Sequence, residues 1–494
     1  MVPRTIGLFV ALFVALTASA VRAQSPRAGD LSVEPFSLKT FDGRDVPAEL
    51  GRLWVRENRE GDSDRLIQLA FVRLRSTAEK PAAPIVFLAG GPGVPGIAMG
   101  RVPVYFQLFS RLRDVADLIL LDQRGTGMSV PNLECSLDVP LPADVFATHD
   151  DAVAGMMSSV RACADHWHAQ GVELRAYNTR ASADDLDDVR RALGAERISL
   201  LGFSYGGELA LDAVRRHSLH LERVVFASMR GPDHTMKLPG TYDTHFRRLS
   251  RLAAADPAIG QLVPDLAALL RQVLEKMNRQ PLSLTVNDRR AGAPVSLSVG
   301  PTALQAVLQS AASDGRARPA LPAMLYALSQ GDDSLLAPHV ERLYNSFRAG
   351  TSSMSVAMDC SSGWSAERQA RARREARQAL LGDVMNFRLR ADICQVVGNP
   401  DLGAEFRSPV WSTVPALFLS GSLDAGSPPF QSEEVRWGFA NSVHIIVENA
   451  GHESLPADDV QAVVVDFFKG EDISGRRVTF PPPRFLSLEQ AKSR

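Results

Sequence analysis

Residues 200–207 read LLGFSYGG and place Ser204 in a Gly-x-Ser-x-Gly pattern. A serine hydroxyl is a weak nucleophile at neutral pH, so a serine that attacks a carbonyl needs a histidine to take its proton and a carboxylate to orient that histidine. The pattern alone is weak, because glycine and serine are common residues that match it often by chance. The rest of the chain must supply the two partners.

A carboxylate and a histidine follow in the order that this chemistry requires. The loop directly after the apolar run at residues 414–420 contains Asp424, and the loop directly after the run at residues 443–448 contains His452. Both runs are short, as is typical of buried parallel strands. Since the carboxyl ends of parallel strands meet at one edge of a sheet, we expect Ser204, Asp424 and His452 to form a catalytic triad.

Each of these residues also has a structural interpretation: Ser204 as an ordinary serine, Asp424 as a turn residue or helix cap, and His452 as a surface-loop histidine. Their joint occurrence, in this order and after strands, favours catalysis. The rival acids to Asp424 do not directly follow a strand; they are Asp458, Asp459 and Glu433. His444 lies inside its strand pattern and is expected to be structural.

The glycines around Ser204 suit a sharp turn between a strand and a helix. Gly202 and Gly206 remove the β-carbons that would collide around a strained backbone at the serine. The amide of Tyr205, at the start of the following helix, would then point toward a developing oxyanion and benefit from the helix dipole. A second oxyanion amide is expected in the earlier glycine-rich loop GGPG, where Gly91 is the candidate.

Strand and helix patterns alternate around these motifs. Apolar runs at residues 84–88 and 116–122 indicate buried strands, and a helix pattern with one apolar face covers residues 205–216. Strand, turn and helix therefore stand in the order that Gly-x-Ser-x-Gly requires. We predict an α/β protein with the α/β-hydrolase fold, in which a mostly parallel central sheet is flanked by helices.

The patterns also divide the chain into a core in two parts and an insertion. We predict the first part of the core over residues 24–230 and a mainly helical cap insertion over residues 231–407, where helical apolar stripes replace the strand runs. The second part of the core, with the acid and the histidine, is predicted over residues 408–480. Residues 481–494 begin with three prolines and are expected to form an extended end.

Residues 1–23 have the shape of a secretory signal peptide, in which a basic residue precedes an apolar run and small residues follow. We predict cleavage after Ala23, with Ala20 as the alternative site and a retained N-terminal anchor as the alternative interpretation. The mature protein would then be exported, to the periplasm or the medium, with no membrane attachment. The formal charge of −2 gives no sign of a nucleic-acid partner.

Four cysteines remain in the mature chain: Cys135, Cys163, Cys360 and Cys394. An even number in an exported chain suggests two disulfides, for which three pairings exist. Proximity in the sequence favours Cys135 with Cys163 and Cys360 with Cys394. A metal site is not expected, because no Cys-x-x-Cys or clustered histidine spacing accompanies these residues.

The motifs together resemble those of a known family. They are GGPG at residues 90–93, DQRGTG at residues 122–127, GFSYGG at residues 202–207, GSLDAGSPP around Asp424 and GHES at His452. The likeness runs over about residues 80–470 and indicates the prolyl and tripeptidyl aminopeptidases, which are serine aminopeptidases of the α/β-hydrolase fold. Prolyl members usually carry His before GGPG and Trp after the serine. This chain has Ala89 and Tyr205 there, so the exported tripeptidyl-aminopeptidase-like branch fits better.

This resemblance implies an exported serine hydrolase that releases residues or short peptides from the free N-terminus of peptides, without a cofactor or metal. The insertion would roof the site and limit it to short peptides. A cap carboxylate would have to bind the substrate amine, and Asp233 is the candidate. Arg124, within DQRGTG, would either bind substrate or form a structural ion pair. Glu208, one turn beyond Ser204, is expected to be an ordinary helix carboxylate.

Two other functions stay open on the sequence alone. An esterase or amidase acting on small hydrophobic compounds would use the same nucleophile, so the motif does not separate it from a peptidase. A requirement for a free amine would favour the peptidase. An exported binding protein on a hydrolase scaffold would need an intact but idle triad, and failure of a phosphonate to label Ser204 would favour that alternative.

Overall fold

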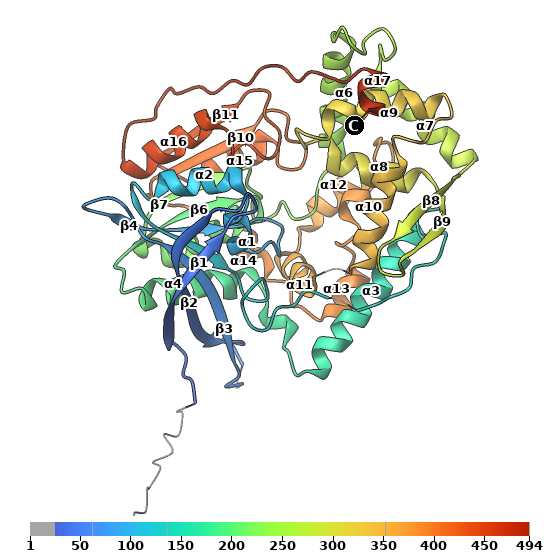
Figure 1. The fold of residues 1–494 in the computed structure, drawn as a ribbon. Coiled ribbons are helices and arrows are strands. Elements are labelled where there is room, and N and C mark those ends of the chain that lie inside the picture. Colours follow the sequence, from blue (N-terminus) through green and yellow to red (C-terminus); the bar gives the residue numbers. More distant parts are fainter. Residues whose placement is uncertain (1–24, 62, 136, 351, 494) are drawn as a thin grey trace, which may run out of the picture.

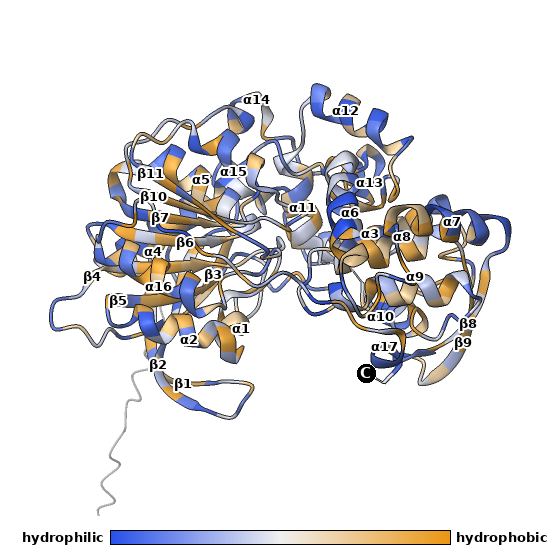
Figure 2. Ribbon diagram, turned by 90° about the horizontal axis from the view of Figure 1, so that it is seen from above, coloured by the Kyte–Doolittle hydropathy of each residue, from blue (hydrophilic) through white to orange (hydrophobic). Residues whose placement is uncertain are grey.

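The computed structural model describes residues 25–61, 63–135, 137–350 and 352–493. The predicted signal peptide at residues 1–23 lies outside this part of the chain, so its cleavage stays a prediction. Within the described residues, no helix combines the length and the apolar character that crossing a membrane would need. Figures 1 and 2 show two lobes, one built around a sheet and one mainly of helices.

A nine-stranded sheet forms the core of the first lobe (Figure 1). Its strands, in spatial order, are β1 (Leu31–Lys39), β2 (Asp45–Arg56), β3 (Leu66–Leu74), β5 (Ala116–Asp122), β4 (Ala82–Leu88), β6 (Ile198–Phe203), β7 (Leu221–Ala227), β10 (Ala416–Gly421) and β11 (Ser442–Val447). The first three strands pair antiparallel and β3 joins β5 antiparallel, whereas β5, β4, β6, β7, β10 and β11 run parallel. The predicted, mostly parallel sheet is confirmed.

Helices cover both faces of the parallel strands, which explains why these strands are nearly wholly apolar (Figure 2). The helices on one face are α1 (Gly96–Gly100), α2 (Pro103–Leu112) and α16 (Asp458–Lys469), and those on the other are α4 (Thr179–Ala192) and α5 (Tyr205–His217). A further helix, α15 (Pro429–Arg436), packs against β10 and β11. All residues of β6 are buried, so this strand contributes to both cores.

Most helices of residues 231–407 lie in the second lobe, whereas the last of them packs beside the sheet lobe, where Arg215 of α5 donates to Phe406 O (Figures 1 and 2). The helices of this segment are α6 (Pro239–Ala254), α7 (Leu266–Arg279), α8 (Pro301–Ala311), α9 (Leu321–Ser329), α10 (Ala337–Arg348), α11 (Ser353–Ser362), α12 (Ala366–Ala376), α13 (Ala391–Val397) and α14 (Gly403–Arg407). One helix that precedes this segment, α3 (His149–Ala169), packs against α10 and α13. The domain boundaries given above stay a prediction.

The same segment contains a β-hairpin that the helical patterns did not predict. The strands β8 (Leu282–Asp288) and β9 (Ala293–Val299) pair antiparallel, apart from the main sheet. Side chains of β8 are alternately exposed and buried, and Leu284, Val286 and Asp288 are the buried ones. This period of two residues is the signal of a half-buried strand, and the helical patterns around it obscured that signal.

Both pairs of cysteines form disulfides. Cys135 is bonded to Cys163, 28 residues away, and Cys360 is bonded to Cys394, 34 residues away. This is the pairing that proximity in the sequence favoured. Because Cys360 lies in α11 and Cys394 in α13, the second disulfide ties two helices of the second lobe together.

The C-terminal segment crosses from the sheet lobe to the helical lobe (Figure 1). Beside β11, the amide of Phe480 donates to the carbonyl oxygen of Glu448 at 2.9 Å. Farther along, the amide of Leu486 donates to Pro319 O at 2.9 Å, and Phe485 is buried. The segment ends in the short helix α17 (Leu488–Lys492), which packs against α9. The end of the chain is thus extended only as far as this packed helix.

Candidate active site

Ser204 occupies the sharp turn between β6 and α5. Its backbone has φ 56° and ψ −117°, a strained conformation for a residue with a side chain. A β-carbon added to Gly202 would lie 2.5 Å from Gly206 O, and one added to Gly206 would lie 2.0 Å from Leu88 O. The turn therefore requires both glycines, and it presents Ser204 at the carboxyl end of β6.

Asp424 and His452 lie in the loops that follow β10 and β11. Nδ1 of His452 and Oδ2 of Asp424 are 2.6 Å apart, which is a hydrogen bond. The other carboxylate oxygen, Oδ1, accepts from the amides of Gly426 and Ser427, each at 2.9 Å. The Asp424 side chain is fully buried. With both of its oxygens engaged, it holds the imidazole in one orientation and leaves Nε2 for another group.

The pair shifts the proton affinity of both members. Burial lowers the pKa of His452, but the charge of Asp424 and its hydrogen bond outweigh burial, so the pKa lies above its ordinary value. Burial raises the pKa of Asp424, but the charge of His452, its hydrogen bond and the amide of Ser427 hold the pKa below its ordinary value. The carboxylate is therefore ionised at neutral pH and favours a protonated imidazole.

Ser204 and His452 line one cavity of about 340 Å³. The other lining residues include Gly91, Arg230, Asp424 and Glu453 from the sheet lobe and Lys237, Tyr242, Gln309, Ser310 and Asp314 from residues 231–407. The His452 ring packs on Phe203, with ring centroids 5.2 Å apart. Both residues are described, and no hydrogen bond joins Ser204 Oγ to the His452 ring. In hydrolases this bond often forms only when substrate is in place.

Two backbone amides next to Ser204 have no partner in the part of the chain that the structure describes. Tyr205 N is the first amide of α5, and Gly91 lines the cavity with φ 109°, a conformation that favours glycine. Among the described residues, neither amide donates a hydrogen bond to another protein group. A β-carbon at Gly90 would lie 2.9 Å from Ser204 Cβ, so this glycine-rich loop packs directly against the turn.

Comparison with known proteins assigns the family. A sequence model of the α/β hydrolase fold matches residues 83–458, which is most of the chain. This chain belongs to the α/β hydrolase family. The predicted fold class is thereby confirmed.

Several curated relatives match this hydrolase over part of its length. Serine protease Hip1 of Mycobacterium tuberculosis is 30% identical over 165 residues, which cover 32% of this chain and 31% of that protein. The tripeptidyl aminopeptidase of Streptomyces coelicolor is 28% identical over 198 residues, covering 38% and 36%. The Escherichia coli protein YuaR is 25% identical over 163 residues, covering 33% and 30%. The matches thus span about a third of the length of each relative.

Two residues predicted to bind substrate lie outside the cavity of this hydrolase. Asp233 accepts hydrogen bonds from N and Oγ of Ser365, each at 2.7 Å, and so fixes the residue that caps α12. Arg124 is fully buried, pairs with Asp185 at 2.7 Å and donates to three backbone carbonyls. Asp233 is therefore a helix-capping partner, and Arg124 forms the structural ion pair that the sequence left open as an alternative.

The rival acids have other partners. Glu433 accepts a hydrogen bond from the ring of His444, and both residues lie outside the cavity. Asp458 pairs with Arg111 at 2.7 Å, and Asp459 is exposed at the start of α16. Among these acids and Asp424, only Asp424 contacts the histidine that lines the cavity with Ser204.

A buried ionic cluster next to the turn was not predicted from the sequence. Arg230, which follows β7, donates through Nε to Glu208 and through Nη1 to Asp359, the latter at 2.7 Å. Ser362 Oγ donates to Glu208 at 2.5 Å, and the amide of Arg230 donates to Ser204 O at 3.2 Å. Glu208 therefore couples the turn to α11 and is not an ordinary helix carboxylate. Arg230 and Asp359 are 129 residues apart, so no local pattern could pair them.

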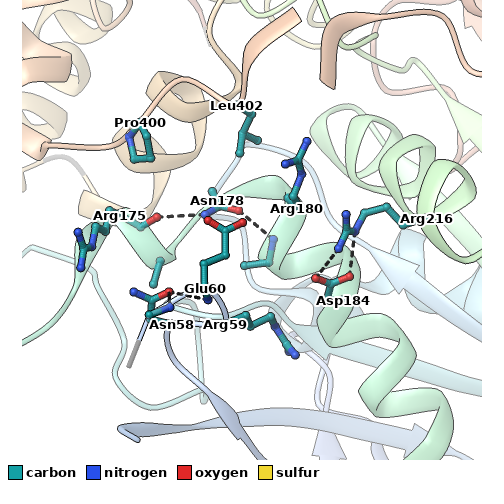
Figure 3. A pocket seen from close by; sticks show the side chains of 13 residues that line it. Asn58, Arg59, Glu60, Arg175, Asn178, Arg180, Asp184, Arg216, Pro400 and Leu402 are labelled. Atoms are coloured by element: carbon teal, nitrogen blue, oxygen red, sulfur yellow. Dashed lines mark hydrogen bonds and ion pairs between the residues drawn. The ribbon is translucent and has the colours of Figure 1, made fainter. Parts of the chain in front are cut away.

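A second pocket, of about 450 Å³, lies around the start of α4 (Figure 3). Its arginines are held in ion pairs: Arg216 binds Asp184 at 2.8 Å, and Arg59 binds Asp185 and Asp188. None of the predicted catalytic residues lines this pocket. Two further arginines of this pocket, Arg175 and Arg180, form ion pairs with Glu173 and Glu405.

Proposed function

We propose that this hydrolase is a serine peptidase that removes residues or short peptides from the free N-terminus of peptide substrates. One observation carries the proposal: a serine in a strained strand-to-helix turn and a histidine bound to a buried carboxylate line the same cavity. The partial matches to a serine protease and to a tripeptidyl aminopeptidase support peptides as the substrate class.

In the proposed reaction, Ser204 Oγ attacks the substrate carbonyl carbon while His452 Nε2 takes the hydroxyl proton, and Asp424 stabilises the imidazolium that results. The C–N bond then breaks as His452 gives this proton to the leaving amine, which leaves an acyl-enzyme. Water, deprotonated by the same imidazole, attacks the ester carbonyl. The N-terminal fragment leaves as a carboxylic acid, and Ser204 recovers its proton.

The amides of Tyr205 and Gly91 are the proposed donors to the oxyanion. Both are without a protein partner among the described residues, so neither must break a hydrogen bond when negative charge develops on the substrate oxygen. Donors that are already in place lower the barrier because no reorganisation is needed at the moment of reaction. Tyr205 N also lies at the positive end of α5.

Recognition of a free N-terminus requires an anionic group for the protonated amine. The carboxylates that line the cavity are Asp314, Asp424 and Glu453, and Asp424 is bound to His452. Asp314 and Glu453 therefore replace Asp233 as our candidates for the amine site. A charge-assisted hydrogen bond to either one would favour a free amine over a blocked N-terminus.

We also propose that the protein is exported, to the periplasm or the medium. Two disulfides suit an oxidising compartment, and a reducing cytosol would keep these thiols free. The signal-peptide pattern of residues 1–23 supports the same location.

The test compares matched fluorogenic tripeptidyl amides with free and acetylated N-termini, beside a short acyl ester. The protein lacking residues 1–23 should cleave the free-amine peptides with a kcat/KM at least about a hundredfold higher, since losing a charged hydrogen bond and leaving its partner unpaired costs about 2–3 kcal/mol. The double variant Asp314→Asn/Glu453→Gln should narrow this preference by raising KM for the free-amine peptides alone.

Equal turnover of free and acetylated peptides would overturn the aminopeptidase assignment. If the acyl ester were also hydrolysed as fast, an esterase or amidase acting on small hydrophobic compounds would take its place. Loss of all hydrolysis in Ser204→Ala is expected under both outcomes, so that variant checks only that the measured turnover belongs to this protein.

A further inference from the structure

An unpaired lysine lines the active-site cavity. Lys237 stands two residues before α6 and lines the same cavity as Ser204. Its ammonium donates to the carbonyl oxygen of Gly426 at 2.8 Å, in the loop that carries Asp424. Within the described residues no carboxylate forms an ion pair with it. An ammonium has three donor hydrogens, so two of them have no acceptor among the described residues.

Two hydrogen bonds with one side chain hold the backbone at Lys237 in place. The side chain of Asn386 accepts a hydrogen bond from Lys237 N at 2.8 Å and donates one to Lys237 O at 3.0 Å. Asn386 is itself buried and donates to Asp383 at 2.6 Å. A lysine whose backbone is held in place loses less conformational freedom on binding a ligand than a lysine on a mobile surface segment does.

A second cation lies close to Lys237. Arg230 also lines the cavity, and its side chain is 7% exposed. Two of its nitrogens bind Glu208 and Asp359, but Nη2 is buried without a hydrogen-bond partner. Burial and the charge of Arg230 lower the pKa of Lys237 to about 7, although the charge of Asp424 acts in the opposite direction. The charge of Arg230 thus disfavours the protonated form of Lys237, and an anion bound between the two side chains would favour that form.

We propose that Lys237, backed by Arg230, is a carboxylate-binding subsite, and that this hydrolase prefers peptides with an acidic side chain on a residue that flanks the cleaved bond. Glu208 and Asp359 are the counterions of Arg230, whereas no described carboxylate forms an ion pair with Lys237. A substrate carboxylate would accept the free hydrogens of the ammonium and take the place of a missing counterion. The inference rests on the proposed peptidase function.

The test measures kcat/KM on matched free-amine peptide amides that differ only in one side chain, Asp against Asn and Glu against Gln, placed before or after the cleaved bond. At one of these positions the acidic peptide should be preferred at least about tenfold, which corresponds to about 1.4 kcal/mol. Lys237→Met should abolish this preference, and Lys237→Arg should keep most of it, because the charge is retained. Lys276→Met is the control: that amine also donates to backbone carbonyls, but outside the cavity.

Three outcomes are decisive. No preference for the acidic peptide at either position, or a preference that survives in Lys237→Met, would overturn the subsite. A loss of kcat/KM in Lys237→Met that is equal for acidic and neutral peptides would assign Lys237 to holding the Asp424 loop instead. If the wild-type protein cleaves no free-amine peptide of the set, the proposed function itself fails, and that failure is visible before any variant is made.

Discussion

The carboxylate of Asp424 sets the pH at which His452 can act as a base. The neutral imidazole takes the serine proton, so kcat/KM should rise with pH through the pKa of His452, which Asp424 holds above its ordinary value. In Asp424→Asn the charge that raises the pKa of His452 is lost, whereas the burial that lowers this pKa remains. The rising limb of the profile should therefore move to lower pH. The maximal kcat should fall by about 10⁴-fold, because an asparagine amide favours the wrong imidazole tautomer and carries no charge to stabilise the imidazolium. Profiles of both kcat and kcat/KM, taken over a range that spans about pH 5–8, where histidine titrates, measure the two effects.

A matched control exists in the chain itself. Glu433 and His444 form another carboxylate–imidazole pair, outside the cavity. Glu433→Gln removes that carboxylate but should leave the pH profile of kcat/KM in place. A profile that moved in Glu433→Gln and not in Asp424→Asn would show that the wrong acid has been assigned.

At the scale of single residues, the sequence predicted those members of the site that lie in loops directly after buried strands. Ser204, Asp424 and His452 each lie in a turn or loop directly after an apolar run, so their meeting at one edge of a parallel sheet could be predicted from the order of the runs along the chain. Asp233 could not be placed in this way, because it lies in an irregular segment whose path depends on packing. The role of Arg230 was not predicted either, because its partner Asp359 lies 129 residues farther along the chain.

At the scale of single elements, the close contact between α5 and the loop after β4 limits the turn to glycine. In Gly206→Ala the new methyl group would lie 2.0 Å from Leu88 O, so the start of α5 must shift and Tyr205 N with it. We expect kcat to fall at least about a hundredfold, as for loss of one oxyanion donor. The Tm should also fall. The control is Gly315→Ala, where nothing lies within 4 Å and the Tm should be kept. An active, fully stable Gly206→Ala would contradict the turn geometry.

The disulfide between α11 and α13 should matter for stability and for turnover. Cys360 is next to Asp359, which holds Arg230 beside Ser204. The double variant Cys360→Ser/Cys394→Ser should lose about 4 kcal/mol from chain entropy, for a loop of 34 residues. Both the Tm and kcat should therefore fall.

The Cys135→Ser/Cys163→Ser variant releases a loop of 28 residues and is the matched control. It should lower the Tm by a similar amount but kcat by less, because neither cysteine is next to a residue that binds Arg230. Equal losses of kcat in the two double variants would show that the Cys360–Cys394 bond has no particular link to the turn.

The elements of the core were predictable because each buried strand is a short apolar run that ends in a loop with glycine. The hairpin of β8 and β9 was not predicted. Its alternation involves few apolar residues, and the strong helical stripe of α7 directly before it favoured a helical interpretation of the whole segment. A strand pattern, with a period of two residues, has to be evaluated separately from an adjacent helical pattern, with a period of 3.6 residues.

At the scale of the whole molecule, the C-terminal segment links the two lobes. Phe485 is buried in the helical lobe, whereas Phe480 binds the backbone beside β11 in the sheet lobe. We expect Phe485→Ala to cost about 3–5 kcal/mol, the usual cost of emptying a buried phenylalanine site. Thermal unfolding measures this as a lower Tm. Arg484→Ala, at an exposed neighbour, should leave the Tm nearly unchanged. Equal Tm values for the two variants would show that the segment is not part of the packed fold.

The central claim is that Ser204 is the nucleophile, and labelling with an aryl phosphonate tests it most directly. Peptide mapping by mass spectrometry should find one adduct, on Ser204. The adduct should be absent from Ser204→Ala and His452→Ala and retained in Ser310→Ala, since Ser310 lines the same cavity without the strained turn. An adduct on Ser310 or another serine, or no adduct on a protein that hydrolyses peptides, would contradict the account.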